Sequence, residues 1–391
     1  MATFTGFYGI ILSMDIVYII LFILLFNAYF IKVIAGRLAD VRENYMWMLF
    51  AVHFILTVAY LLYAAQSRSD SVSYYNNTQD VEDWLLFFET GTKFIGFLSW
   101  PFINLLGLSY YAVMLLFSYF GYLAVLFFYL MVKENVQLLP SWNGLTAVEL
   151  VFLLPNLHFW SSSLGKGSPI LLGLSLVAYG LSRFNRRILT ILFGGLLVFM
   201  IRPHIIFAII VSVAIGIFLT RSGIRPLYKW LIFILSIFLF YYISGDVLKF
   251  TDSDSLDITS SSVLSHRASE LGKASSGVDI QNYNLVFKLF TFWFRPLFVD
   301  GLGALGFIVS FENLICLIMF GFALVQGIKT WSQWNGYFRI AVFIFLLGSF
   351  MLAQVSGNLG IAMRQKAQFM PFFFLLYCKA LSYRQKNMIR A

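Results

Sequence analysis

The chain has 391 residues, of which 60% are hydrophobic and 12% charged, with a formal net charge of +9 and a mean hydropathy of +0.83. A soluble globular protein carries about 25% charged residues, so this composition excludes one and indicates an integral membrane protein. The basic residues occur in short clusters between apolar stretches, which is the pattern of membrane topology, and we therefore predict no nucleic-acid partner.

The apolar stretches predict an all-α polytopic membrane protein, a single domain over residues 1–391 with about eleven transmembrane helices. The expected spans, in chain order, are residues 10–31, 46–65, 108–131, 145–160, 170–182, 188–201, 205–220, 227–243, 305–328, 338–355 and 367–382. Because basic residues follow the first stretch and do not precede it, we expect it to remain as a helix and not to be cleaved as a signal peptide. The basic clusters then place the N-terminus outside and the C-terminus inside.

Two long loops fall on the outer side, at about residues 66–107 and 245–300. The first ends in a broken apolar stretch at 94–106, which we expect to be re-entrant or interfacial. The second closes with an aromatic stretch at 283–298, which we expect to be a helix lying in the membrane interface. Several middle spans are too short to cross upright, so they should tilt or end around a polar cavity.

Three arginines, Arg202, Arg295 and Arg364, fall at the outer edge of the bilayer in this topology, where Lys and Arg are disfavoured. A cation kept there is costly and is usually retained to hold an anion. Pro296 and Pro371 closely follow two of them, so we expect these arginines to mark helix starts, where the helix dipole also favours an anion. An arginine that reaches the lipid headgroups is the structural alternative for any one of them.

The segment 155–169 concentrates polar groups between two short spans, with His158, Lys166 and four serines. Together with backbone amides freed by its glycines, these groups could form an anion-binding nest. A phosphate-binding P-loop is excluded, because Trp160 stands five residues before Gly165, where that motif needs a glycine. The alternative is a helical hairpin whose serines cap helix ends.

Other ionisable residues are candidates for proton transfer or need partners. His204, two residues after Arg202, can take a proton near neutral pH, and Asp70 is an acidic candidate in the first outer loop. Asp15 and Glu312 fall inside predicted spans, where they either join helices or line a cavity.

The sequence predicts no metal site. Cys316 and Cys378 both lie in apolar segments, so they form neither a disulfide framework nor a CxxC site. Asp252 and Asp254 have the spacing of metal ligands, but their stretch is rich in Ser and Asp and is more typical of a solvated loop.

Short motifs follow one another along most of the chain. They are Ser69-Asp70-Ser71 with Tyr74, Gly96-Phe97 with Pro101, Leu106-Gly107-Leu108-Ser109-Tyr110, Phe159-Trp160-Ser161-Ser162-Ser163-Leu164-Gly165-Lys166, Arg202-Pro203-His204, Phe294-Arg295-Pro296-Leu297 with Glu312-Asn313, and Gly357-Asn358-Leu359-Gly360 with Arg364 and Pro371. In this order they resemble bacterial oligosaccharide repeat-unit polymerases of the Wzy or exopolysaccharide-polymerase type, which are relatives of the GT-C membrane glycosyltransferases. The chain departs from the expected pattern at Gly167, where we would expect an acidic residue, and this removes a carboxylate from the site.

The resemblance implies a GT-C-like fold in the bacterial inner membrane and an enzyme that joins oligosaccharide repeat units carried on polyprenyl pyrophosphate at the outer face. A hydroxyl of one lipid-linked unit would attack the anomeric carbon of another, with His204 or Asp70 as general base. Four cations would stabilise the leaving lipid pyrophosphate, with no metal or other cofactor: Arg202, Arg295, Arg364 and Lys166. Further substrate contacts are expected from Tyr74, His158, Ser162 and Ser163. The implied partners are the lipid-linked oligosaccharide and membrane lipid, and a chain-length regulator is a possible further one.

Two alternatives stay open. One is another GT-C-like glycosyltransferase or glycan ligase that uses a lipid-phosphate sugar donor and relies more on an acid in the outer loop. The other is a transporter or flippase of lipid-linked glycan, in which cavity arginines also make sense. Transporters often pair two halves with interrupted helices in matching places, whereas here the short spans cluster in one region, which favours the enzyme.

Overall fold

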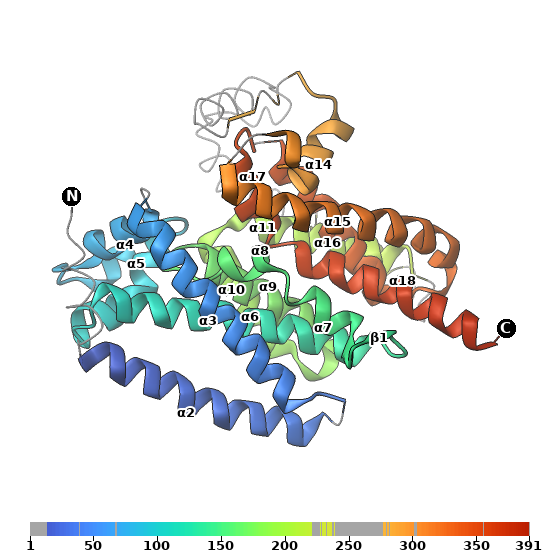
Figure 1. Cartoon of the computed structure of the whole chain (residues 1–391). Coiled ribbons are helices and arrows are strands. Elements are labelled where there is room, and N and C mark those ends of the chain that lie inside the picture. The colour runs from blue at the N-terminus through green and yellow to red at the C-terminus, as the bar shows by residue number, and fades with distance from the viewer. Residues whose placement is uncertain are drawn as a thin grey trace. The chain divides into compact units, whose positions relative to one another are not determined.

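The computed structural model describes residues 14–38, 40–66, 69–220, 277–278, 280, 282–300, 303–354 and 356–390, with short stretches between 227 and 238. These residues are mostly helical (Figure 1). Contacts divide the chain into two compact units, each with its own core. The first takes in Met1–Lys133 and Leu157–Arg202, and the second takes in Glu134–Asn156 and Pro203–Ala391.

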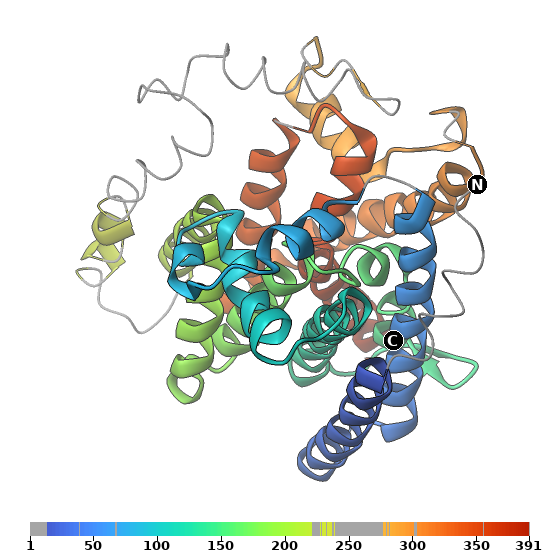
Figure 2. The same cartoon turned by 90° about the vertical axis from the view of Figure 1, so that its left-hand side faces the viewer.

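The first unit is built around α6 (Tyr110–Asn135). In the most apolar stretch of this helix, 78% of the residues are buried. By contrast α2 (Met14–Arg37) lies at the edge of its unit (Figures 1 and 2). Only 17% of the residues in its most apolar stretch are buried, and Leu25 and Tyr29 are exposed. An apolar helix surface of this size is stable against lipid and not against water. The other elements are α3 (Glu43–Gln66), α4 (Asp70–Thr78), η1 (Trp84–Phe87), α5 (Lys93–Trp100), η2 (Pro101–Leu105), the end of α8 (Pro155–Phe159), α9 (Gly167–Leu181), η3 (Phe184–Arg186) and α10 (Ile188–Ile201).

Glycines let the segments of this unit approach closely. A Cβ added at Gly121 of α6 would lie 1.9 Å from the carbonyl oxygen of Ser161, and one added at Gly173 of α9 would lie 2.8 Å from the carbonyl oxygen of Gly194 in α10. Because lipid gives helices no hydrophobic reason to associate, small residues that bring backbones into contact are typical of membrane interiors. The segment after α8 is thereby packed directly on α6, and α9 on α10.

The second unit joins its helices through aromatic rings. The ring of Phe345 lies 4.6 Å from that of Trp293 and 5.8 Å from that of Phe373, centroid to centroid, and Phe320 contacts both phenylalanines. In this unit α15 runs beside α18, and α14 beside α17 (Figure 1). The elements are β1 (Ser141–Trp142) paired antiparallel with β2 (Leu145–Thr146), α7 (Ala147–Val151), the start of α8, α11 (Pro203–Phe218), α14 (Leu285–Phe294), η4 (Phe298–Asp300), α15 (Gly303–Thr330), η5 (Trp331–Gln333), α16 (Gly336–Ala353), α17 (Leu359–Lys366) and α18 (Met370–Arg390).

The expectation of an all-α membrane protein is confirmed as a fold class. Among the described residues, 5 helices are long and apolar enough to cross a membrane: Met14–Arg37, Glu43–Gln66, Tyr110–Asn135, Gly306–Gln333 and Gly336–Ala353. Each corresponds to a predicted span. The shorter apolar helices α9, α10 and α11 match three short predicted spans, and α18 covers most of the last one. The total of about eleven spans and the orientation of the termini stay predictions.

The span predicted at 145–160 is wrong. Thr146 and Glu149 form a capping box that starts α7, but this helix ends after 5 residues. Leu154 then precedes Pro155, and the residue before a proline is driven away from helical backbone angles. The chain therefore folds here as a hairpin and two short helices. The span predicted at 227–243 is described only in short stretches, and most of the outer loop predicted at 245–300 lies outside the described residues.

The first outer loop is folded into short helices, namely α4, η1, α5 and η2. The broken apolar stretch within it forms α5 and the π-helical turn η2, which ends before Gly107, a residue with a positive φ of 61°. The aromatic stretch near the end of the second loop forms a helix, α14, as predicted, and its place in the membrane interface stays a prediction.

Candidate functional site

In the first unit, two predicted cations are tied to the turn that precedes α5. Lys166 Nζ donates to Thr92 Oγ1 at 2.6 Å. The N–H of the neighbouring Gly91 donates to the Met200 carbonyl at 2.8 Å, two residues before Arg202. Arg202 ends α10 and is 9% exposed. The segments that carry Lys166 and Arg202 are therefore fixed to the same turn, as an anion site that uses both would require.

Asp70 and Tyr74, two further predicted site residues, lie one turn apart on α4. Residues separated by four positions share a helix face. A Cβ added at Gly165 would lie 3.4 Å from Cε2 of the Tyr74 ring, so this face of α4 meets the segment that carries Lys166. Asp70 itself is exposed.

Hydroxyl groups hold α4 in place. Ser69 caps the helix by accepting from the Ser71 N–H, and Ser71 Oγ lies 2.7 Å from the Tyr110 hydroxyl. The Tyr75 hydroxyl donates to the Leu108 carbonyl at 3.0 Å. The position of Asp70 is thus set by contacts to the start of α6, and not by a free loop.

The serine-rich segment after α8 uses its polar groups internally. The Ser162 hydroxyl donates to the His158 carbonyl at 2.5 Å, and the Ser168 hydroxyl donates to the Ser163 carbonyl at 3.0 Å. All four residues are buried. The structure therefore favours the alternative of a capped hairpin over an open nest, and it places His158, Ser162 and Ser163 as supports of the turn.

His158 is paired with His53, a residue that the sequence did not single out. Their Nδ1 atoms lie 3.0 Å apart, and His53 Nε2 lies 2.9 Å from the Ser118 carbonyl oxygen. A carbonyl only accepts, so His53 Nε2 carries a hydrogen, and in neutral His53 the Nδ1 atom then accepts from the N–H of His158. A histidine in the middle of a predicted span was the available signal for this pair.

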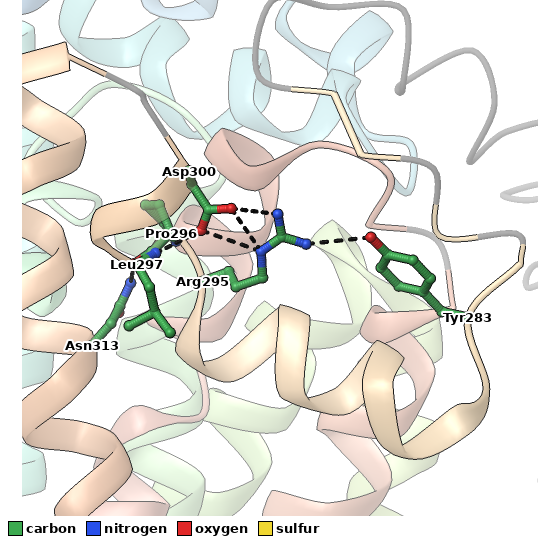
Figure 3. Close-up of polar contacts among 6 residues, drawn as sticks. All are labelled: Tyr283, Arg295, Pro296, Leu297, Asp300 and Asn313. Atoms are coloured by element: carbon green, nitrogen blue, oxygen red, sulfur yellow. Dashed lines mark hydrogen bonds and ion pairs between the residues drawn. The ribbon is translucent and has the colours of Figure 1, made fainter.

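In the second unit Arg295 lies at the end of α14, and the expectation that it starts a helix is wrong. Its Nε donates to both oxygens of Asp300, at 3.0 and 3.2 Å, and its Nη2 also donates to that carboxylate (Figure 3). Its Nη1 donates to the Tyr283 hydroxyl at 3.4 Å. A partner carboxylate, which the sequence did not identify, therefore offsets the positive charge of Arg295.

The Arg295–Asp300 pair changes the pKa of both groups. Burial alone would raise the pKa of Asp300, but hydrogen bonds from Arg295 and from the Leu297 N–H outweigh it and hold that pKa below its usual value. The hydrogen bonds of Arg295 to Asp300 and to Tyr283 outweigh its burial and raise the pKa of Arg295. Both groups are thus kept charged as an ion pair.

Arg364 lies in the last turn of α17, so the expectation that it starts a helix is also wrong. Asn358 provides the N-cap of this helix, because its Oδ1 accepts from the N–H groups of Gly360 and Ile361 at 2.8 and 3.2 Å. The positive end of the helix dipole therefore points to Asn358, and Arg364 lies at the opposite end of the helix.

Glu312 and Asp15 have partners within their own units. Glu312 Oε2 accepts from the Asn156 N–H at 2.9 Å, and Asp15 Oδ2 accepts from the Ser109 N–H at 2.8 Å. The sequence left open whether these two residues join helices or line a cavity. For both residues the observed contacts join separate segments of the chain. His204 is buried in the first turn of α11, which belongs to the second unit.

Lys366 and Asn313 are buried polar residues that the sequence did not assign to the site. Lys366 Nζ donates to the Trp293 carbonyl at 3.1 Å and to Asn313 Oδ1, while Asn313 Nδ2 donates to the Pro296 carbonyl at 2.7 Å. Asn313 could have been noticed as an amide inside a predicted span. Lys366 directly precedes a predicted span, where a lysine is ordinarily interfacial, so no local signal showed its burial.

The part of the chain that the structure describes contains no group of three or more His, Cys, Asp or Glu side chains arranged to hold a metal ion. Asp252 and Asp254 lie outside this part.

In comparisons with known protein families, curated proteins and solved structures, the chain matches none of them.

Proposed function

We propose that this protein is a membrane glycosyltransferase that joins oligosaccharide repeat units carried on polyprenyl pyrophosphate. The observation that best supports the proposal is the place of Arg202. It is buried at the junction of α10 and α11, two apolar helices with no other charged residue. A permanent cation in such surroundings is costly and is usually kept because an anion binds there.

The reaction needs a stabilised leaving group and a proton acceptor. The hydroxyl oxygen of one repeat unit bonds to the anomeric carbon of the other, and the bond from that carbon to pyrophosphate breaks with its electrons remaining on the pyrophosphate oxygen. The hydroxyl proton passes to a base, for which we propose His204 or Asp70. Cations fixed before the reaction stabilise the developing charge without reorganising.

We assign this stabilising role to Arg202, Lys166 and Arg364. Lys166 and the end of α10, two residues before Arg202, bond to one turn of the first unit, and Arg364 lies on α17 of the second. Arg295 is expected to contribute less, because Asp300 already offsets its charge.

The test is an elongation assay with purified protein in lipid nanodiscs. Lipid-linked repeat units are added, and the products are separated by size. Arg202→Ala and Arg364→Ala should each lower elongation by about a hundredfold or more, since a preorganised donor to a developing charge is typically worth that much. Arg186→Ala, at an exposed position outside the predicted site, is the control and should elongate normally. Normal elongation by both test variants would rule out the anion site.

The same assay separates the alternatives. Elongation with a lipid-monophosphate donor but not with the pyrophosphate donor would favour the other glycosyltransferase class. If labelled lipid-linked glycan crosses a vesicle bilayer while no ladder of longer products forms, the protein is a transporter and the enzyme proposal fails.

A further inference from the structure

Lys366 holds the backbone on both sides of Arg295. It is 1% exposed, and its ammonium donates to the Trp293 carbonyl at 3.1 Å and to Asn313 Oδ1. Asn313 in turn bonds to the backbone after Arg295, because its Nδ2 donates to the Pro296 carbonyl at 2.7 Å (Figure 3). The two carbonyls that are held belong to residues before and after Arg295.

A second set of contacts holds the backbone around Arg364. Asn156 Nδ2 donates to the Met363 carbonyl at 3.2 Å, and the Asn156 N–H donates to Glu312 at 2.9 Å. Lys366 lies two residues after Arg364 on α17. Residues two apart on a helix point in different directions, so Lys366 can anchor the buried side of α17 while Arg364 projects elsewhere.

We infer that Lys366 is a positioning residue that fixes Arg295 and Arg364 for binding the pyrophosphate of a lipid-linked glycan. This inference rests on the proposed function. A buried ammonium is costly unless good acceptors surround it. One acceptor of Lys366, the Trp293 carbonyl, lies in the segment that carries Arg295, and the other, Asn313, bonds to Pro296 beside it. The helix of Lys366 carries Arg364.

The test measures binding of polyprenyl pyrophosphate, without glycan, to the full chain in nanodiscs, with polyprenol as the reference lipid. Lys366→Met keeps a side chain of similar length but removes the charge and the donors. It should weaken pyrophosphate binding about tenfold or more, the usual loss when a hydrogen bond to a charged group is removed. Lys288→Met is the matched control, because Lys288 is a partly buried lysine of the same unit that bonds to Gln354 and not to the residues flanking Arg295. It should bind as the wild type does.

A second comparison separates positioning from a merely structural role. If Lys366 acts through the arginines, Lys366→Met should cause little further loss when Arg295 and Arg364 are already alanine. Lys366→Gln, which restores a neutral donor, should recover part of the affinity. A lowered unfolding temperature with unchanged pyrophosphate affinity, or a full additional loss in the arginine-free background, would overturn the inference.

Two further outcomes are informative. If Lys366→Met does not fold, Asn313→Leu tests the same link, because it breaks the contact to Pro296 and keeps the lysine. Unchanged pyrophosphate binding by Asn313→Leu would overturn the inference.

If the wild type binds pyrophosphate no better than polyprenol, the proposed function itself fails. If the wild type binds it and Lys366→Met binds it equally, only the positioning role fails.

Discussion

At the scale of single residues, a charged side chain near the predicted anion site is not automatically available to the substrate. The guanidinium of Arg295 is engaged by Asp300 and Tyr283, and the residues around it are held by Lys366 and Asn313. Arg295 therefore has a structural role in the free protein. Its partner Asp300 is mostly buried, with 6% of the side chain exposed, so this ion pair should matter more than a surface pair.

The pair predicts a pH dependence of stability. The pKa of Asp300 in the folded chain lies below its value of about 3.9 in the unfolded chain, so its stabilising contribution is fully present above that value. The contribution is lost as the pH falls through the folded-state pKa. Asp300→Asn should lower the free energy of unfolding by about 1–3 kcal/mol at pH 7, and the difference from wild type should shrink in acid.

Thermal unfolding of both proteins between pH 7 and pH 3 measures this difference. The exposed pair of Glu89 and Lys93 provides the control, and Glu89→Gln should have little effect at any pH. A constant difference between Asp300→Asn and wild type across the range would contradict the proposed contribution of the ion pair.

The buried histidine pair makes a second prediction at this scale. Replacing either His53 or His158 by Leu leaves a buried ring nitrogen of the other without its partner, which should cost about 1–3 kcal/mol of unfolding free energy. The double variant should cost less than the sum of the two, because no nitrogen of the pair is then left unpaired. Denaturation of the wild type, the two single variants and the double variant in one detergent gives the double-mutant cycle that measures this difference. Strict additivity would show that the contact contributes nothing.

At the scale of elements, close contact between backbones decides where the polar segments lie. The segment after α8 carries Lys166, and its backbone touches α6 at Gly121, where a side chain has no room. The contact is to a backbone carbonyl, which cannot turn away as the end of a flexible side chain would. The position of the predicted cation Lys166 is therefore linked to a glycine in the neighbouring helix.

Gly121→Ala should destabilise the protein by about 1–3 kcal/mol through overpacking, and it should weaken elongation because the segment that carries Lys166 is displaced. Gly321→Ala is the matched control, since Gly321 also lies within an apolar helix but a Cβ there meets nothing within 4 Å. That change should be neutral or slightly stabilising, because alanine is the better helix former. Equal unfolding temperatures for the two variants would refute the close contact.

At the scale of the whole molecule, the predicted topology assigns the sites to the outer face. The prediction is testable with single cysteines in a background where the buried Cys316 and Cys378 are replaced by alanine. Asn77→Cys in α4 should react with a membrane-impermeant maleimide in intact cells, and Lys386→Cys near the end of α18 should react only after the cells are opened. Both positions are exposed, so burial does not explain a failure to react. The reverse pattern would place the predicted site in the cytoplasm.

Local pattern was enough to predict the class of protein and most of the apolar helices. A stretch of apolar residues long enough to cross a bilayer forms a helix because its backbone groups must bond to each other in lipid, whatever the rest of the chain does. The exception at 145–160 was also local in origin, since a capping box and Pro155 interrupt the helix there. The span was predicted from hydropathy alone, which does not take the capping box or the proline into account.

The candidate site was predictable only as a set of unusual residues: the sequence alone placed Arg202 and Arg364 at the outer edge of the bilayer and Lys166 in a polar segment between two short spans. It could not show which polar residues are partners, because partners lie far apart along the chain: Lys166 bonds to Thr92 across 74 positions, His158 pairs with His53 across 105, and Glu312 with Asn156 across 156. The pairing depends on which helix faces meet and how closely. Only the tertiary structure decides that, since packing brings distant backbones together and burial then requires each polar group to find a partner.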